Sequence, residues 1–561
     1  MKKELIAITV ATLISSVCIP LIATIKKIER LDGEVMHLPY DYASLGSFSN
    51  LCVVAISSGF LLFFLGYLFY FKSLKSFYYK AIYSITWLLT LIECFCLIKF
   101  DLSISPPMIS IMGDTNNAAE IRSFFELYFD WTSLLGILLL IVIAWVLWQW
   151  AEKIGDFVKE YKKAFISVFV LLIIFAVTGY KLGGNTASTP LQKTIYSLNH
   201  ARKISNIINK MAEEKENKVE ILSDKSDVHA FIFVVGESGS RNMMGIYNKA
   251  YDSTPLCQKL IDSGNMFAFT DTISMKSVTA LCIPPLLSFM DNENTTTDLS
   301  KFDSIVDVFN KADFQTFWVS NHEKLTKDMS YATMLGMKSN HYAHTAKVSG
   351  CSEYVPWLCT KDEVVLKPLD EYKEKFLEQH KKNFLVFHLM GSHARYIDRY
   401  PESFAKYTTK DIKDTRYGSE VKKSIAEYLN SIYYTDYILN EIINRFKDDD
   451  AILVYAPDHG EELGEGGFFG HGPSNVSQYM VQIPLLVWVS DKYKEKRPEN
   501  VERIKRALNR PFMTDNLSHA IIDMAGITTK QFEATKSVVN DAFTERPRIV
   551  TNGKKYEELR K

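Results

Sequence analysis

Five apolar stretches in the first 182 residues limit the possible folds of this 561-residue chain more than any other feature. We place them near residues 5–25, 48–71, 78–98, 128–150 and 164–180. A helix needs about 20 mostly apolar residues to cross a bilayer, and each stretch is about that long. Lys2 and Lys3 before the first stretch are also typical of a signal peptide, but no small-residue cleavage pattern follows and four more stretches do. The sequence therefore predicts an α-helical membrane domain of five spans over residues 1–182.

Charged residues divide the chain at the same place. They number 29 in the first 182 residues and 100 in the remaining 379. The chain as a whole has 64 basic and 65 acidic side chains, for a net charge of −1. Proteins that bind nucleic acid usually carry a clear basic excess, so this balance argues against a nucleic-acid partner.

The loops between the apolar stretches indicate an orientation. With a cytoplasmic N-terminus, the inner segments hold nine Lys and Arg residues and the outer loops hold five. Such an excess marks the cytoplasmic side. Five spans that start inside end outside, so we expect the rest of the chain in the periplasm or the cell exterior. Glu93 lies near the outer end of the third stretch, where it is either a functional intramembrane carboxylate or a side chain that reaches the headgroups.

The part after residue 182 is predicted to be a linker and an α/β domain. Residues 183–227 hold two glycines and then a Lys/Glu-rich stretch around 199–220 with helical apolar spacing, which predicts a linker and a surface helix. Beyond them, apolar runs with helical segments such as 427–446 between them are typical of parallel strands covered on both faces. Four such runs cover residues 229–235, 314–319, 383–388 and 451–456. We therefore expect a central, mostly parallel sheet within residues 228–561.

Polar residues follow the ends of these runs. Glu237, Asn321, His322 and His393 come after the first three, and the adjacent Asp458 and His459 come after the fourth. Open α/β sheets place their sites at the carboxyl ends of strands, so these side chains should converge. Each alone is more often a cap or a surface group. Together the two carboxylates and the imidazole suit zinc better than magnesium.

Two further features bear on this site. A glycine-rich loop returns His471 twelve residues after His459, as another nitrogen donor. Upstream, the hydroxyls of Ser274, Ser277 and Thr279 precede a proline-marked helical segment. A hydroxyl at a helix N-terminus lies beside N–H groups that bind oxyanions, and a base or a metal can turn it into a nucleophile. All three residues also suit an N-cap, and their spacing does not choose among them.

The sequence resembles a known family, the lipopolysaccharide phosphoethanolamine transferases, which include the mobile colistin-resistance enzymes. The resemblance covers nearly the whole chain and implies a periplasmic domain of the alkaline phosphatase and sulfatase type. The segments that carry it are Val235-Gly-Glu237-Ser238, Thr279-Ala280 before Pro284, His388-Leu-Met-Gly-Ser-His393 with Arg399-Tyr-Pro401, and Asp458-His-Gly-Glu461-Glu-Leu-Gly-Glu465 with His471.

The resemblance implies a role for each site residue. Glu237, Thr279, Asp458 and His459 match the zinc ligands, and Thr279 matches the nucleophile. His393 and His471 match histidines near the transferred phosphate or a second metal, so one zinc ion is expected and a second is left open. The positions that match substrate contacts are Asn321, His322, Lys324, Thr115 and Glu120.

The sequence also departs from the family pattern. Ala394-Arg395 stand where the family commonly has Gly-Pro, which puts the loop shape there in doubt. Of the usual disulfides, only the pair spaced like Cys351 and Cys359 is present, while Cys257 and Cys282 have no obvious partner. The other four cysteines lie in the apolar stretches, where we expect them to pack as apolar side chains: Cys18, Cys52, Cys94 and Cys96.

The activity that the resemblance implies is zinc-dependent transfer of phosphoethanolamine from phosphatidylethanolamine to lipopolysaccharide through phosphoethanolamine-Thr279. It implies a multi-pass protein of a Gram-negative inner membrane, and we expect a monomer. Lipid A phosphate, Kdo and heptose stay open as acceptors, and with them any change in polymyxin resistance.

Three other functions are alternatives to phosphoethanolamine transfer. A glycerophosphotransferase would use the same fold. A sulfatase is disfavoured because Cys282-Ile-Pro-Pro-Leu286 lacks the arginine of the formylglycine sequence. A non-catalytic, membrane-anchored binding protein would lack a ligand or the nucleophile, and none is missing.

Overall fold

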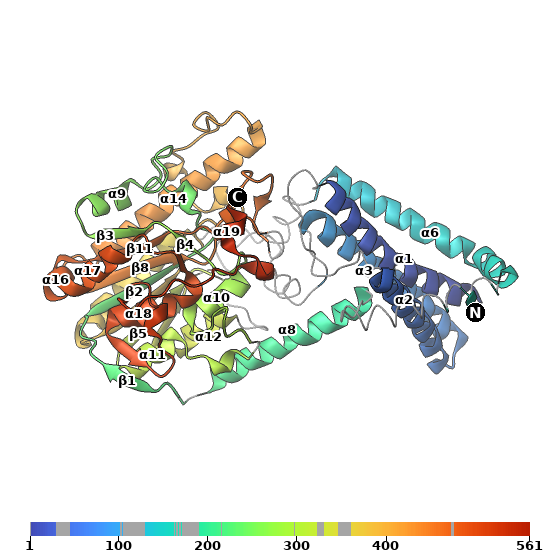
Figure 1. Cartoon of the computed structure of the whole chain (residues 1–561), viewed down its shortest axis with the longest axis horizontal. Helices are drawn as coiled ribbons and strands as arrows, with labels where there is room; N and C mark the ends of the chain where they lie inside the picture. Colours follow the sequence, from blue (N-terminus) through green and yellow to red (C-terminus); the bar gives the residue numbers. More distant parts are fainter. Residues whose placement is uncertain are drawn as a thin grey trace. The chain divides into compact units, whose positions relative to one another are not determined.

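The computed structural model describes residues 2–29, 45–100, 129–161, 190–214, 216–296, 298–322, 330–345, 361–472 and 476–560, with positions 104, 163, 166, 167 and 170 (Figure 1). Contacts divide the chain into two units, whose described parts are residues up to 201 and from 202 onward. The limits predicted at residues 182 and 227 stay predictions.

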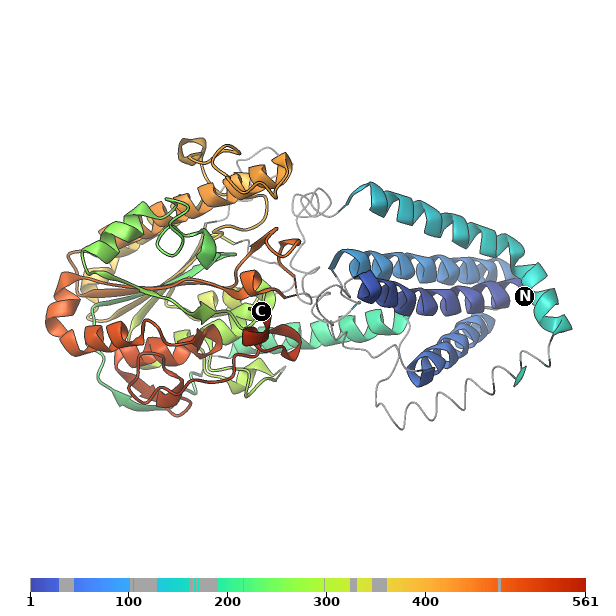
Figure 2. The same cartoon turned by 45° about the horizontal axis from the view of Figure 1, so that its top comes forward.

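The first unit consists of long apolar helices. These are α1 (Lys2–Glu29), α2 (Leu45–Leu65), the short η1 (Gly66–Leu68), α3 (Lys72–Phe100) and α6 (Trp131–Glu160). Helix α1 packs against α2, α3 and α6 (Figure 2). The approach of α2 is close, since a Cβ on Gly59 would lie 2.8 Å from Thr9 Cα. Small residues allow such contacts between membrane helices.

Large apolar side chains on these helices are exposed, as expected of helices that face lipid. Within the described residues, Lys72–Ile98 and Trp131–Glu160 are each long and apolar enough to cross a membrane, and Ala55–Leu65 is a shorter apolar segment. Helices α1 and α2 overlap the first two predicted stretches. Most of the fifth, 164–180, lies outside the described residues. The exposed side chains include Leu61, Phe64, Phe77, Leu135, Leu139 and Trp145.

Helix α8 (Pro190–Glu213) begins in the first unit and continues into the second. A helix is present in this region, but it starts earlier and ends earlier than the stretch 199–220. Proline suits the first turn of a helix, where its missing N–H is not needed, and Pro190 occupies that place. After α8 the chain forms strand β1 (Ile221–Asp224), which pairs with β13 (Ile527–Thr529) in a separate, antiparallel two-stranded sheet.

A seven-stranded sheet forms the centre of the second unit, in the order β3-β11-β8-β2-β7-β5-β6. The parallel strands are β2 (Ala230–Gly236), β5 (Gln315–Ser320), β6 (His341–His344), β7 (Asn383–His388) and β8 (Ala451–Pro457). All four predicted strands are confirmed within a residue. The sequence did not predict β11 (Leu485–Val489), which lies antiparallel to β8 and to β3 (Met266–Phe269).

Short strand pairs lie beside this sheet. β4 (Thr272–Ile273) pairs in parallel with β12 (Phe512–Met513), and β9 (Glu462–Leu463) forms a hairpin with β10 (Phe469–Gly470). The helices that follow α8 are α9 (Pro255–Asp262), α10 (Thr279–Leu287), α11 (Ile305–Lys311), α12 (Tyr331–Lys338), α13 (Leu366–Lys375), α14 (Ser419–Asn444), α15 (Gln478–Val481), α16 (Asp491–Lys496), α17 (Pro498–Ala507), α18 (Leu517–Ala525) and α19 (Tyr556–Leu559).

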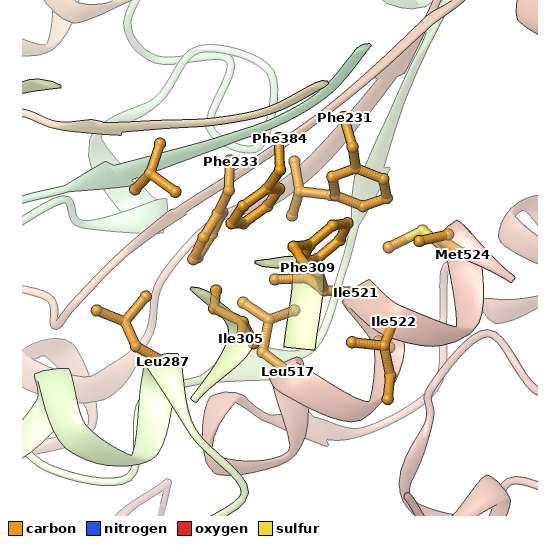
Figure 3. Close-up of a cluster of buried hydrophobic side chains, with 14 of the residues drawn as sticks. Phe231, Phe233, Leu287, Ile305, Phe309, Phe384, Leu517, Ile521, Ile522 and Met524 are labelled. Carbon is orange, nitrogen blue, oxygen red and sulfur yellow. The ribbon is translucent and has the colours of Figure 1, made fainter. Parts of the chain in front are cut away.

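Both faces of the sheet are buried, which explains why its strands are apolar throughout. In β2, Phe231 and Phe233 point to the face covered by α10, α11, α12, α17 and α18, whereas Ile232 and Val234 point to the face covered by α9, α13 and α14 (Figure 1). Figure 3 shows the first face, where strand phenylalanines meet side chains of α11 and α18. There the rings of Phe309 and Phe384 stack with centroids 3.8 Å apart.

Candidate active site

The register of two adjacent strands brings Glu237 and Asp458 together. Gly236 at the end of β2 lies opposite Pro457 at the end of β8, so the next residue of each strand leaves the sheet at the same level. The backbone N–H of Ser238 donates to Asp458 Oδ1 at 3.1 Å, and the N–H of His459 donates to the same oxygen at 2.8 Å. These bonds hold one carboxylate oxygen of Asp458 and leave the other for a ligand.

The loop after β7 packs directly on Glu237. Gly391 has φ +47°, and a Cβ at this position would lie 2.6 Å from the carbonyl oxygen of Glu237. The N–H of Ser392 donates to that oxygen at 2.9 Å. Glycine is the residue that tolerates both the positive φ and the close approach. The segment that leads to His393 is thereby fixed against the loop of Glu237.

Glu237, Asp458 and His459 form a buried group whose ligand atoms all lie within 4.8 Å of one another. His459 Nε2 is 3.5 Å from Glu237 Oε1 and 3.5 Å from Asp458 Oδ2. The other ring nitrogen, Nδ1, is 2.8 Å from the carbonyl oxygen of Gly460 and so donates a proton there, which leaves a lone pair on Nε2. We call these three residues the first metal group.

The first metal group has the properties of a cation site. Asp458 Oδ2 is buried and has no hydrogen-bond partner among the residues that the structure describes. A buried carboxylate oxygen without a partner is costly, and two adjacent carboxylates add repulsion. Burial raises the pKa of Glu237, and the charge of Asp458 raises it further. Burial also lowers the pKa of His459. Two carboxylates and a neutral imidazole are ligands that zinc prefers, so the residues fit this ion.

Thr279 points at the first metal group from the start of α10. Its Oγ1 lies 3.1 Å from Glu237 Oε2 and 3.3 Å from His459 Nε2. The two competing hydroxyls are engaged elsewhere: Ser274 Oγ donates to the carbonyl oxygen of Lys276, and Ser277 Oγ donates to that of Gly472. The structure therefore distinguishes Thr279 from its neighbours. The first N–H groups of a helix have no partners within it and can bind phosphate oxygens.

A second group of possible metal ligands shares His459 and adds Glu461 and His471. The β9–β10 hairpin returns the chain, so that the rings of His459 and His471 lie 4.2 Å apart. His471 Nδ1 is 2.6 Å from Glu461 Oε2, and the Tyr396 hydroxyl donates to Glu461 Oε1 at 2.5 Å. Burial lowers the pKa of His471, but the Glu461 carboxylate more than offsets this, so the pKa is raised overall.

The sequence alone indicates no role for Glu461 or Tyr396. Glu461 lies two residues after His459, within a motif that was already recognised, so its position was a usable signal. Tyr396 carried no such signal, since it reaches Glu461 from a different loop. Both side chains act on the orientation of His471.

His393 lies in the loop fixed by Gly391. Its Nδ1 is buried and lacks a hydrogen-bond partner within the described ranges. Burial lowers the pKa of His393 well below its usual value, and the positive charges of Arg399 and His471 lower it further. The ring is therefore neutral near pH 7.

The loop that follows His393 departs from the family pattern. Arg395 has φ +59° and pairs with Asp398 at 3.0 Å. Proline, the common family residue at this place, fixes φ near −65° and cannot adopt this conformation. A proline at this place could not adopt the loop conformation of this chain, and a difference in loop shape from the relatives stays a prediction.

Asn321 and His322 pack against the same β7 loop. Asn321 is buried, and its Nδ2 donates to Asp362 Oδ1 at 2.9 Å. Asp362 in turn accepts the N–H of Gly391 at 2.8 Å. His322 Nε2 donates to the carbonyl oxygen of Leu389 at 2.9 Å. Both side chains thus support the loop, and their contact with substrate stays a prediction.

Several predicted residues lie outside the described residues: Thr115, Glu120, Lys324, Cys351 and Cys359. Cys257 and Cys282 are buried free thiols, in agreement with the prediction that neither has a disulfide partner. Cys52, Cys94 and Cys96 are also buried, which fits their predicted role as apolar packing.

Comparisons with known proteins agree with this geometry. The family model described as Sulfatase matches residues 229–527. Phosphoethanolamine transferase EptC of Escherichia coli K12 is 26% identical over 343 residues, which cover 60% of this chain and 57% of that protein. Phosphoethanolamine transferase EptA of the same strain is 24% identical over 336 residues. The match thus spans less than two thirds of the length of these relatives.

Solved structures extend the likeness. The crystal structure of the C-terminal periplasmic domain of E. coli EptC in complex with Zn has a TM-score of 0.54 at 25% identity and covers 61% of this chain and 96% of that one. The integral membrane protein EptA from Neisseria meningitidis shares the fold over 95% of this chain and 97% of its own, with a TM-score of 0.64 at 18% identity. The family model matches more than half of the chain and includes every residue of the first metal group and Thr279, so the chain belongs to the sulfatase family.

Proposed function

We propose that this protein is a zinc-dependent phosphoethanolamine transferase that moves phosphoethanolamine from phosphatidylethanolamine to lipopolysaccharide, on lipid A or a core sugar. The observation that carries the proposal is the position of Thr279, whose hydroxyl lies within hydrogen-bond distance of Glu237 and His459. The names of the relatives and the zinc complex of one structural neighbour support it.

We propose that Glu237, Asp458, His459 and Thr279 hold the zinc ion. When bound, this ion supplies positive charge that favours ionisation of a nearby hydroxyl and offsets charge on phosphoryl oxygens. The hydroxyl of Thr279 donates to Glu237 Oε2 at 3.1 Å, so its proton has an acceptor in place. A second ion would have Glu461 and His471 as ligands, since the lone pair of His459 Nε2 serves the first ion and Nδ1 donates to Gly460.

In the first step, Thr279 Oγ1 attacks the phosphorus of the donor lipid. A bond forms between that oxygen and phosphorus, and the bond from phosphorus to the diacylglycerol oxygen breaks. We propose that His471 protonates the leaving oxygen through Nε2, because Glu461 holds its Nδ1. His393 is the other candidate for this proton transfer.

In the second step, an acceptor hydroxyl or phosphate oxygen attacks the phosphorus of phosphoethanolamine-Thr279. The bond to Thr279 breaks and the threonine regains its proton from Glu237, while a hydroxyl acceptor gives its proton to the histidine that protonated diacylglycerol. Asn321, His322, Lys324, Thr115 and Glu120 are proposed substrate contacts on the basis of the resemblance, as is the disulfide between Cys351 and Cys359.

The proposed setting is the inner membrane of a Gram-negative bacterium. It comprises five spans up to residue 182, a linker to residue 227 and a periplasmic catalytic domain from residue 228, in a monomer. Helices α3 and α6 and the fold shared with the integral membrane EptA of Neisseria meningitidis support it. Donor and acceptor would then share one membrane with the enzyme, which raises their effective concentration.

The test is the identity of the group on Thr279. Purified full-length protein is mixed with vesicles that hold both phosphatidylethanolamine and phosphatidylglycerol, and the intact protein and its peptides are weighed by mass spectrometry. We expect phosphoethanolamine on Thr279 and zinc in the metal analysis. A glycerophosphate adduct would instead show glycerophosphate transfer, and protein without zinc or adduct would show a non-catalytic binding protein.

A further inference from the structure

Glu93 and Lys193 form a buried ion pair in the first unit. Glu93 lies in α3 and Lys193 in the first turn of α8, and their Oε1 and Nζ atoms are 2.7 Å apart. The side chains are 0% and 7% exposed. The second oxygen of Glu93, Oε2, accepts the backbone N–H of Ile104 at 2.7 Å. Both carboxylate oxygens of Glu93 are therefore occupied by contacts within the protein.

This pair joins two segments that are 100 residues apart in the chain. Charged side chains in membrane helices are costly unless they are paired, and lysines near helix ends usually extend to water instead. Here the lysine turns inward and the carboxylate turns toward it. Removal of one partner would leave an uncompensated buried charge, whereas replacement of both by neutral side chains often preserves stability. The pair thus fixes the start of α8 to α3.

The first turns of α8 have an inverted polarity. Lys193 and Ser197 are buried, while Ile195, Tyr196 and Leu198 are 52%, 63% and 49% exposed. A helix in water would turn its polar residues outward. Aromatic and apolar side chains of this kind are typical of the membrane–water interface, where a tyrosine has both an apolar and a polar neighbour. The outward face of these turns is therefore suited to lipid.

We propose that Glu93 and Lys193 are positioning residues, which hold the first turns of α8 against α3 so that the exposed face of these turns lies in the membrane interface. These turns belong to the first unit, which ends at residue 201. The inference rests on the proposed function, since it matters only for an enzyme whose substrates are lipids.

The experiment compares two donors in the full-length protein. One donor is long-chain phosphatidylethanolamine in vesicles that also hold lipopolysaccharide, and the other is a short-chain, water-soluble phosphatidylethanolamine. The variant is the double change Glu93→Gln with Lys193→Met, which removes both charges of the pair together. Lys203→Met is the matched control, because Lys203 is an exposed lysine on the same helix.

We expect the double variant to lose about tenfold in kcat/KM with vesicles, because the start of α8 is released from the interface that holds the lipid substrates. With the water-soluble donor it should stay within about twofold of wild type, and Lys203→Met should match wild type in both assays. Unchanged transfer in vesicles by the double variant would overturn the proposal, and so would an equal loss with both donors.

Backbone hydrogen exchange separates this inference from the proposed function. We expect faster exchange in residues 191–200 of the double variant than in wild type. If wild type transfers no phosphoethanolamine but the double variant shows this faster exchange, the proposed function fails and the restraint on α8 stands. Equal exchange in the two proteins would overturn the restraint, whatever the activity.

Discussion

Buried carboxylates occur in both units, and their partners differ. In the first unit, Glu93 has a lysine at 2.7 Å and a backbone N–H on its other oxygen. In the second unit, Glu237 and Asp458 lie side by side, and Asp458 Oδ2 has no hydrogen-bond partner in the described part of the chain. A carboxylate that already has its cation is a structural element, whereas a pair without one indicates a metal. Burial alone does not distinguish the two cases.

The strongest test of this contrast is the hydroxyl beside the carboxylate pair. Thr279→Ala should lower phosphoethanolamine transfer by about 1,000-fold or more, since a removed nucleophile leaves only binding and electrostatic contributions. Zinc content and thermal stability should stay close to wild type. Ser277→Ala is the matched control, because this hydroxyl donates to the carbonyl oxygen of Gly472 instead. Full activity of Thr279→Ala would contradict its role.

Removal of the metal or of one of its ligands tests the carboxylate pair of Glu237 and Asp458. Asp458→Asn should weaken zinc binding by more than about 100-fold, since loss of a ligand exceeds the effect of removing a supporting contact. Zinc at 1,000 times its Kd stabilises the wild type by about 4 kcal/mol, so a chelator should lower its Tm and abolish transfer. Glu93→Gln should leave the zinc content unchanged. Zinc content is measured by atomic emission on purified protein, and a metal loss in Glu93→Gln equal to that in Asp458→Asn would remove the contrast.

Asp515 is a buried carboxylate that belongs neither to the Glu93–Lys193 pair nor to the first metal group. It tests how burial alone changes the pKa of a carboxylate and the pH dependence of stability. Burial raises its pKa from 3.8 to about 7, although it accepts the N–H of Asn292. The folded protein therefore holds this proton at pH values where the unfolded chain has lost it. Its contribution to stability is complete below about pH 4 and is lost as the pH rises through 7, by an amount on the order of 4 kcal/mol.

The measurement is the Tm of the full-length protein between pH 4 and pH 8. Asp515→Asn should flatten the decline with pH, while Asp262→Asn, at an exposed position, should leave it unchanged. An identical decline in wild type and Asp515→Asn would show that other groups cause it.

The smallest expected effect on transfer comes from a variant near His471, in the second group of possible metal ligands. Tyr396→Phe removes the hydroxyl that donates to Glu461, so the carboxylate that orients His471 loses one contact. We expect a loss of transfer of about three- to tenfold, at the lower end of effects seen when a supporting contact of this kind is removed. Tyr400→Phe serves as the control, since its hydroxyl accepts from Asn430 instead. Equal activity of both variants would show that the contact to Glu461 is dispensable.

Most of the sheet could be predicted because its strands carry their own signal. The segments 229–235, 314–319, 383–388 and 451–456 are apolar throughout, since helices cover both faces of the sheet. The antiparallel β11 has a similar pattern, but its direction depends on pairing with β8, which no local feature encodes. The earlier start of α8 was also missed, because its first turns have an inverted polarity that resembles no surface helix.

In the candidate active site, too, some residues could be predicted from the sequence and others could not. Residues that follow strand ends, such as Glu237, Asp458 and His459, could be found because parallel strands bring their ends together. The choice of Thr279 over Ser274 and Ser277 needed either the family resemblance or the structure, since three hydroxyls within six residues look alike in the sequence.

By itself, the sequence determined which segments are apolar, where the parallel strands end and which side chains could bind a metal, because these follow from local composition and period. Only the tertiary structure decided which groups meet: Lys193 with Glu93, Tyr396 with Glu461, and Thr279 with the first metal group. The physical reason is that an ion pair or hydrogen bond acts over a few ångströms, and the packing of helices and strands sets which distant residues come that close.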